Sequence, residues 1–252
     1  MLIAVIAVAL GAGVTACAAQ RAGPSARSSV DTAGASAAPG SGPSTSPSAA
    51  RGGLRYVALG DSYTIGTATR TPSERWPDQL IAALGNRAPT LDFVANLGIN
   101  GFTSRDVVEV ELPQFAGLDP EFATLLIGVN DVVQGVPPDT YRANAGRILD
   151  ALLERLPADR IVAVATPDYT VTPQGASYGD PIAQAAGIRA NNEILRQLAA
   201  DRDIAWVDIH DLSLRAAEDR SLVADDGLHP SGAQYALWVE RIAPVVAGLI
   251  TP

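Results

Sequence analysis

The 252-residue chain contains no lysine, one cysteine and two histidines, and these shortages exclude much chemistry. Without lysine there can be no P-loop phosphate clamp, Schiff base or catalytic lysine. The single cysteine, Cys17, excludes an intramolecular disulfide and a zinc site built from cysteines. A catalytic base that works at neutral pH must therefore be a carboxylate or one of His210 and His229. The net charge of −9 argues against nucleic-acid binding, which relies on clustered basic residues.

Residues 2–14 form an uncharged apolar run, shorter than the roughly 20 residues that a membrane-spanning helix needs. We interpret residues 1–16 as a signal peptide. The VTAC segment that ends at Cys17 resembles the bacterial lipobox, which implies a lipidated cysteine as a membrane anchor. No Lys or Arg precedes the run, so three alternatives stay open: a start other than Met1, an uncleaved anchor, or a fortuitous cysteine in an ordinary signal peptide. All of these interpretations place the remainder outside the cytoplasm.

Residues 17–52 are expected to form a disordered tether that starts at the lipidated cysteine. Of the 35 residues from 18 to 52, 27 are Ala, Ser, Gly or Pro. This composition cannot bury enough apolar surface to offset the entropy lost on ordering. The remaining residues, 53–252, contain 15 basic and 26 acidic residues and carry a net charge of −11. We expect them to form one acidic domain, without a second domain boundary.

Short apolar runs alternate with longer amphipathic ones along this domain. The expected strands are residues 55–59, 91–96, 123–127, 160–165 and 204–209, and the expected helices are residues 73–84, 104–112, 138–156, 181–201 and 231–249. The strands are too apolar to be half exposed and suit a parallel sheet that is covered on both faces. The pattern predicts an α/β fold, a three-layer α/β/α sandwich around a five-stranded parallel sheet.

Polar segments follow the first three expected strands and precede the last expected helix. They read GDSYT from residue 60, NLGING from residue 96, GVND from residue 128 and DDGLHP from residue 225. Ligands of open parallel sheets bind beyond the carboxyl ends of the strands. We therefore expect these four segments to converge at one edge of the sheet.

Within these segments, Ser62, His229 and Asp226 can form a catalytic triad. A serine is a poor nucleophile unless a neighbouring base, itself held by a third group, removes its proton. The spacing of three residues between Asp226 and His229 lets the carboxylate fold back onto the imidazole. Asp225 is the alternative partner of the histidine, and the DxxH spacing favours Asp226. A metal site built from the two histidines and these aspartates has no specific ligand spacing, and we expect none.

An oxyanion hole is expected beside the triad, made from the Ser62 backbone N–H, the Gly101 backbone N–H and the Asn130 side chain. Such donors stabilise the negative charge that develops on the substrate oxygen, and each is typically worth roughly 10²–10³ in turnover. Gly98 is the alternative to Gly101, because either glycine can serve a turn.

The four segments resemble the motif blocks of the GDSL/SGNH hydrolases, which supply a serine, a glycine, an asparagine and a histidine. GDSY is similar to the first block, NLGING to the glycine block, GVND to the asparagine block and DGLH to the DxxH block, in the family's order over about residues 55–247. The position in the glycine block favours Gly101. The resemblance implies a flavodoxin-like fold, an ester or thioester hydrolase, an acyl-serine intermediate, and no metal or cofactor.

Other candidate residues receive different interpretations. His210 is taken as structural because it lacks a carboxylate three residues upstream. Ser177 lies in a GASYG segment that fits the G-x-S-x-G pattern, but Pro173 argues against the incoming central strand which that pattern requires.

Aromatic residues divide between core and pocket. The three tryptophans lie in apolar periodic segments and are assigned to the core: Trp76, Trp206 and Trp238. Residues 168–180 are expected to form a surface loop whose Tyr169 and Tyr178 line the acyl or alcohol pocket. Tyr63, next to the nucleophile, is the other candidate for contact with the substrate.

The sequence thus predicts a serine esterase that cleaves carboxylic esters on the outer side of the cytoplasmic membrane, secreted or lipid-anchored. The alternatives are an acyltransferase that uses the same site on envelope carbohydrate, and a non-catalytic surface lipoprotein. The expected partners are an acyl ester of a small molecule, lipid or carbohydrate, and a membrane through the lipid anchor. No motif indicates the oligomeric state, and a monomer is favoured.

Overall fold

The computed structural model of the protein describes residues 52–85 and 90–251, and its centre is a single parallel sheet. The strands are β1 (Gly53–Gly60), β2 (Thr90–Asn96), β3 (Phe122–Leu126), β4 (Ile161–Val164) and β5 (Ala205–Val207). They lie in the order β2-β1-β3-β4-β5, the flavodoxin-like order of doubly wound sheets. The predicted five-stranded parallel sheet is confirmed, with each strand where its apolar run predicted it.

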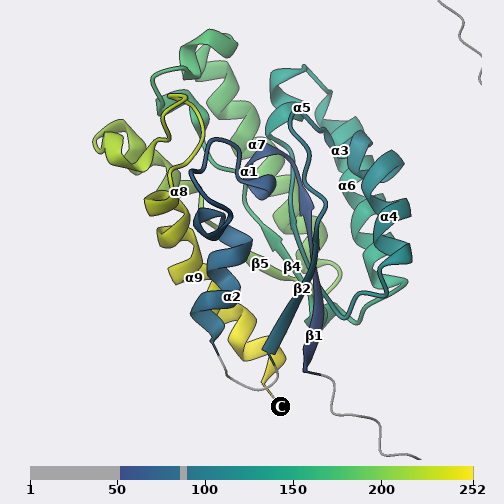
Figure 1. Ribbon diagram of the computed structural model, residues 1–252. Coiled ribbons are helices and arrows are strands. Elements are labelled where there is room, and N and C mark those ends of the chain that lie inside the picture. The colour runs from purple at the N-terminus through teal and green to yellow at the C-terminus, as the bar shows by residue number, and fades with distance from the viewer. Residues whose placement is uncertain (1–51, 86–89, 252) are drawn as a thin grey trace, which may run out of the picture. The chain divides into compact units, whose positions relative to one another are not determined.

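Helices connect the strands and cover the sheet (Figure 1). The α-helices are α1 (Ser62–Ile65), α2 (Trp76–Leu84), α3 (Ser104–Asp106), α4 (Leu112–Gly117), α5 (Val129–Val133), α6 (Pro138–Leu153), α7 (Pro181–Ala200), α8 (His210–Leu214) and α9 (Gly232–Ile250). One π-helix, η2 (Val107–Glu111), joins α3 to α4. Single 3₁₀ turns are η1 (Pro72–Glu74), η3 (Ala158–Arg160), η4 (Tyr169–Val171), η5 (Gly175–Tyr178), η6 (Arg215–Ala217) and η7 (Arg220–Leu222).

Two hydrophobic cores lie on opposite faces of the sheet, which makes the predicted three layers. Successive side chains of a strand point to opposite faces. In β1, Tyr56 and Ala58 therefore belong to one core, which α2 and α9 cover, and Val57 and Leu59 belong to the other, which α4, α6 and α7 cover. The first core also contains the fully buried indoles of Trp76 and Trp238, whereas Trp206 is partly buried.

The helix that was predicted over residues 104–112 is longer and is interrupted by η2. Within η2, the Leu112 N–H bonds to the Val107 carbonyl, five residues earlier. Such a π-turn is rare and often marks a functional site. Pro113 does not end the helix, because it lies in the first turn of α4, where its missing N–H is not needed.

The predicted signal peptide (residues 1–16), the lipidation site Cys17 and nearly all of the tether (17–52) lie outside the described residues. Across residues 52–85 and 90–251, no helix combines the length and apolar character needed to cross a bilayer. The same residues contain no group of three or more side chains that could together ligate a metal ion.

Candidate active site

Ser62 lies at the carboxyl end of β1, where the chain turns sharply into α1. Gly60 has a φ of 150°, and a Cβ atom at this position would lie 2.2 Å from the Leu126 carbonyl oxygen, so the turn requires glycine. The Asp61 side chain caps α1, because its Oδ1 accepts the Tyr63 N–H at 3.0 Å. The turn therefore fixes Ser62 at the mouth of the site.

His229 lies on the tight loop that precedes α9, and Asp226 holds it. Asp226 Oδ2 is 2.6 Å from His229 Nδ1, and Asp226 Oδ1 accepts the backbone N–H groups of Leu228 and His229. Burial acts to raise the pKa of Asp226, but the hydrogen bonds from the His229 ring and from these N–H groups outweigh it and lower that pKa below its usual value. The carboxylate is therefore ionised at neutral pH and is placed to orient the imidazole.

The two rival residues lie elsewhere. Asp225 is exposed and pairs with Arg70 at 3.4 Å, so Asp226, and not Asp225, lies against His229. His210 Nε2 is 3.7 Å from the buried Asp168 Oδ2. His210 follows β5 and does not line the pocket described next, which agrees with a structural role.

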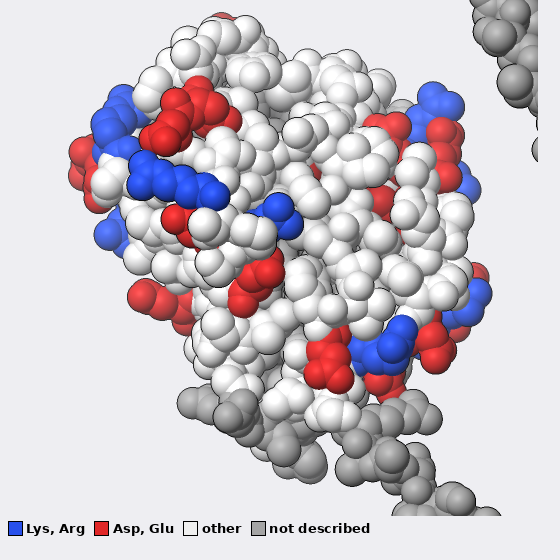
Figure 2. Space-filling model, in the orientation of Figure 1, with Lys and Arg blue, Asp and Glu red and all other residues white. Residues whose placement is uncertain are grey.

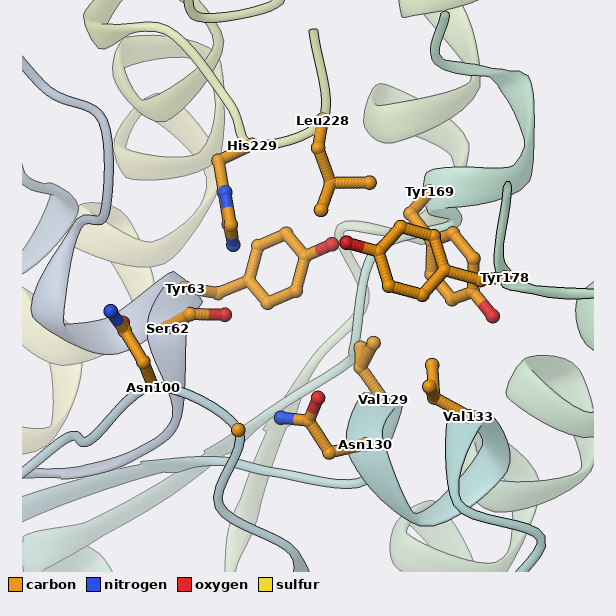
Figure 3. Close-up of a pocket in the computed structure, with 11 residues that line it drawn as sticks. Ser62, Tyr63, Asn100, Val129, Asn130, Val133, Tyr169, Tyr178, Leu228 and His229 are labelled. Carbon is orange, nitrogen blue, oxygen red and sulfur yellow. The ribbon is translucent and has the colours of Figure 1, made fainter. Parts of the chain in front are cut away.

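A pocket with a volume of about 260 Å³ lies at the carboxyl edge of the sheet (Figure 3). It is lined by Ser62, Tyr63, Asn100, Gly101, Val129, Asn130, Val133, Tyr169, Tyr178, Leu228 and His229. The loop segments predicted to converge therefore do so, together with the two tyrosines of the loop after β4. Among the residues that the structure describes, no aspartate, glutamate or arginine lines this pocket. On the face shown in Figure 2, charged side chains gather toward the margins and the upper middle is mostly uncharged.

Ser62 and His229 face each other across this pocket. Figure 3 shows the His229 ring directed toward Ser62. Since Nδ1 is bound to Asp226, the free nitrogen toward Ser62 is Nε2. The Ser62 hydroxyl makes no hydrogen bond to any residue that the structure describes, so attack requires it to turn toward Nε2. Catalytic hydrogen bonds are often long without substrate and tighten when it binds.

Two backbone N–H groups are available beside the nucleophile. Within the described part of the chain, the N–H groups of Ser62 and Gly101 make no hydrogen bond, and both residues line the pocket. The N–H of Gly98 is instead bonded to Asn96 Oδ1 at 3.1 Å, and Gly98 does not line the pocket. The geometry thus favours Gly101 over Gly98 as an oxyanion donor.

The Asn130 amide is held at the edge of the pocket by two acceptors. Its Nδ2 donates to the Phe102 carbonyl at 2.9 Å and to Asp61 Oδ2 at 3.4 Å. The contact with Asp61 is the longer and therefore the weaker of the two. The Asn130 N–H that makes it is the one more easily redirected to the oxygen of a bound substrate.

Ser177, the alternative nucleophile, lies on η5 rather than on a turn between a strand and a helix. Its side chain is exposed, and its Oγ donates to Gln174 Oε1 at 3.4 Å. Ser177 does not line the pocket that Ser62 and His229 line.

Three carboxyl groups buried behind the site were not predicted as functional residues: Asp61, Glu111 and Asp131. Burial raises the pKa of each, to about 7 for Asp61 and about 9 for Glu111. Asp131 accepts the Ser104 N–H at 2.8 Å and the Ser104 hydroxyl at 2.5 Å. Asp61 and Asp131 carried a signal in the sequence, because they adjoin Ser62 and Asn130 in the quoted motif segments, whereas Glu111 carried none.

These groups make the folding stability depend on pH. Because the folded-state pKa values of Asp61 and Glu111 lie above the usual values near 4, unfolding releases protons between about pH 4 and pH 9, and stability falls as pH rises through that window. Each group contributes a slope of up to about 1.4 kcal/mol per pH unit. The lowered pKa of Asp226 stabilises the fold above about pH 4. This contribution to the free energy of unfolding is lost as the pH falls below that value.

We expect the free energy of unfolding in urea to fall steadily from pH 5.5 to pH 8.5 at constant ionic strength. Glu111→Gln should flatten this fall, because it removes one of the titrating groups. Glu109→Gln, on the same helical segment but exposed and paired with Arg105, should keep the wild-type slope. A wild-type stability that is constant over this range would contradict the assignment of neutral buried carboxyl groups.

Solved structures with this fold include three hydrolases. The first is LAE5, an alpha/beta hydrolase enzyme from the metagenome of Lake Arreo, Spain, with 20% identity, a TM-score of 0.63, and coverage of 79% of this chain and 98% of that chain. The second is a variant of Axe2, an acetyl xylan esterase from Geobacillus stearothermophilus, with 18% identity, a TM-score of 0.62, and coverage of 79% of this chain and 97% of that chain. The third is a member of the lipolytic protein G-D-S-L family from Veillonella parvula DSM 2008, with 18% identity, a TM-score of 0.61, and coverage of 77% of this chain and 98% of that chain. At these identities the likeness establishes the shared fold.

The family itself follows from the sequence match. The model of the GDSL-like Lipase/Acylhydrolase family matches residues 58–237, well over half of the chain and a range that includes Ser62 and His229. The chain therefore belongs to this family, and the resemblance stated above is confirmed. No curated protein sequence matches the chain. Family membership supports ester hydrolysis as the class of activity.

Proposed function

We propose that the protein is a serine esterase that hydrolyses carboxylic esters through an acyl-serine intermediate. Ser62 Oγ attacks the acyl carbonyl while His229 Nε2 takes its proton, and His229 then protonates the leaving alcohol. Water, deprotonated by His229, attacks the acyl-enzyme, which releases the acid and restores Ser62. The observation that carries the proposal is the convergence on one pocket of Ser62 and of a His229 ring whose Nδ1 lies 2.6 Å from Asp226.

The oxyanion donors in this proposal are the N–H groups of Ser62 and Gly101 and the Asn130 amide. The first two have no partner among the described residues and both line the pocket. Asn130 would give up its 3.4 Å contact with Asp61 and keep its bond to the Phe102 carbonyl. Preorganised donors of this kind stabilise the tetrahedral intermediate without reorganising during the reaction.

The pocket favours an ester with a small, uncharged acyl group. Its volume is about 260 Å³, and apolar side chains and tyrosine rings make up the wall opposite His229 (Figure 3). No arginine is present to bind an anionic acyl group, and no carboxylate to bind a cationic one. Small apolar cavities discriminate acyl chains by size, at roughly 10-fold or more per methylene.

The test of this function is active-site labelling of the purified protein with a fluorophosphonate, followed by intact mass and peptide mapping. We expect one adduct on Ser62 that is lost in Ser62→Ala and retained in Ser177→Ala. A folded wild-type protein that takes up no label would refute the proposal, and an adduct on Ser177 would move the nucleophile.

Tyr178 is proposed to limit the length of the acyl chain. It is 42% exposed, lines the pocket, and packs edge-to-face on Tyr169 with ring centroids 5.6 Å apart. Tyr178→Ala should raise kcat/KM for p-nitrophenyl hexanoate relative to the acetate by roughly 10-fold. Tyr178→Phe keeps the ring and should keep the preference. An unchanged ratio in Tyr178→Ala would show that this side chain does not bound the acyl site.

We also propose that the enzyme acts outside the cytoplasm, anchored through a lipidated Cys17. The support is the uncharged run of residues 2–14 followed by VTAC. The measurement is mass spectrometry of the N-terminal peptide from membranes of the producing cells. We expect the mass of a diacylglyceryl group on Cys17. An unmodified Cys17, or a mature N-terminus that begins after Cys17, would contradict anchoring.

A further inference from the structure

Glu111 is a buried carboxyl group that none of the four motif segments contains. It is the last residue of η2 and is fully buried. Its Oε2 accepts the Gly60 N–H at 2.9 Å, and its Oε1 has no hydrogen-bond partner among the described residues. A carboxyl group is rarely buried so completely without a specific reason, since burial of its charge is costly.

The partner of Glu111 is the residue from which the nucleophile turn begins. Gly60 ends β1 and stands two residues before Ser62. The last β1 residue paired with β2 is Ala58. The Gly60 N–H, two residues further on, therefore has no acceptor in β2. The Gly60 carbonyl receives the Ile99 N–H at a long 3.4 Å. The Glu111 carboxyl therefore replaces a missing strand partner at the point where the chain leaves the sheet.

The π-turn of η2 explains how Glu111 reaches this position. A π-turn places one additional residue in the helix and shifts the side chains that follow it around the helix axis. The carboxyl group then faces Gly60 instead of solvent, although its neighbour Glu109 is exposed and pairs with Arg105. The charged groups that act on Glu111 are the aspartates Asp61 and Asp106, so an ionised Glu111 would be repelled. Burial together with these neighbours raises its pKa to about 9, which leaves the carboxyl neutral at pH 7.

We propose that Glu111 is a positioning residue for Ser62, which accepts the Gly60 N–H with its side chain and so fixes the turn that presents Ser62. This inference rests on the proposed serine esterase function. Reaction geometry tolerates little error, since a displacement of about 1 Å caused by a distant change can cost roughly 10²-fold in rate. Glu111 does not line the pocket, and its side-chain hydrogen bond among the described residues is to Gly60, so we expect it to act through the turn.

The test compares Glu111→Gln, Glu111→Leu and the control Glu109→Gln in the full chain. The glutamine keeps a neutral acceptor for the Gly60 N–H, whereas leucine has a similar volume and no acceptor. The fluorophosphonate inactivation constants kinact and KI, the kcat and KM for p-nitrophenyl acetate, and the circular dichroism spectrum are measured for each. We expect Glu111→Gln to stay within about 3-fold of wild type and Glu111→Leu to lose roughly 10- to 100-fold in kinact and kcat, with KI and KM changed less than about 3-fold.

If Glu111→Leu does not fold, Glu111→Asp serves instead, because its carboxyl falls one carbon–carbon bond short of Gly60. A folded Leu or Asp variant with wild-type kinact would overturn the proposal. So would a Glu111→Gln variant as slow as Glu111→Leu, since the neutral acceptor would then be insufficient. A wild-type protein that takes no label would instead refute the serine esterase function, so the two failures are distinguishable.

Discussion

Ser62→Ala is expected to lower kcat for p-nitrophenyl acetate by about 10⁶-fold, and His229→Ala by a similar factor. The serine supplies the only bond that the proposed acyl-enzyme forms, and His229 is the base whose ring points toward it (Figure 3). Because the two residues act in one step, the double variant should be no slower than either single variant by more than about 10-fold. Steady-state rates with a freshly purified protein, corrected for spontaneous hydrolysis, measure this.

Ser177→Ala is the matched control, because Ser177 is exposed and lies in the competing motif. It should retain the wild-type rate. Losses that simply add on a logarithmic scale in the double variant would mean that Ser62 and His229 act independently, and the triad would have to be abandoned.

Asp226→Asn is expected to lower kcat by roughly 10⁴-fold with little change in KM. The asparagine can keep the two backbone hydrogen bonds that Asp226 Oδ1 accepts, so the loop should remain folded. Its amide would donate to His229 Nδ1 and thereby place the imidazole proton on Nε2, the nitrogen that must accept a proton from Ser62. The effect is therefore on the tautomer and not on the position of the ring.

Asp225→Asn provides the comparison for this prediction. Asp225 is adjacent in sequence but exposed, and its contact is with Arg70. We expect wild-type kinetics for this variant. A loss of less than about 10-fold in Asp226→Asn, measured on a protein with an unchanged circular dichroism spectrum, would mean that the carboxylate does not set the tautomer.

The sequence predicted the sheet well because its strands are buried on both faces and read as short, continuous apolar runs. It predicted the long helices for a related reason, since each has one apolar face. The convergence of Ser62, Asn130 and His229 on one pocket could be predicted because motif spacing placed them at strand and helix ends, and the parallel topology collects those ends at one edge.

Other features depend on tertiary contacts that no local pattern contains. Glu111 follows three valines and another glutamate in η2, and no local pattern in this segment predicts that the π-turn directs its side chain inward. The complete burial of Asp61 and Asp131 was likewise not predicted, because aspartate is seldom fully buried. The helix was predicted to end at residue 112, but the helical segment continues to Gly117. The apolar wall of the pocket, Val129 and Val133, cannot be told from core residues by sequence.

The chain enters the domain at Gly53, the first residue of β1, whereas the pocket forms beyond Gly60 at the other end of that strand (Figure 1). Eight residues of parallel strand span about 26 Å. An attachment made through the segment before Gly53, whether to a bilayer, a resin or a fused partner, therefore joins the domain at the edge opposite the pocket and leaves the pocket residues out of the linkage.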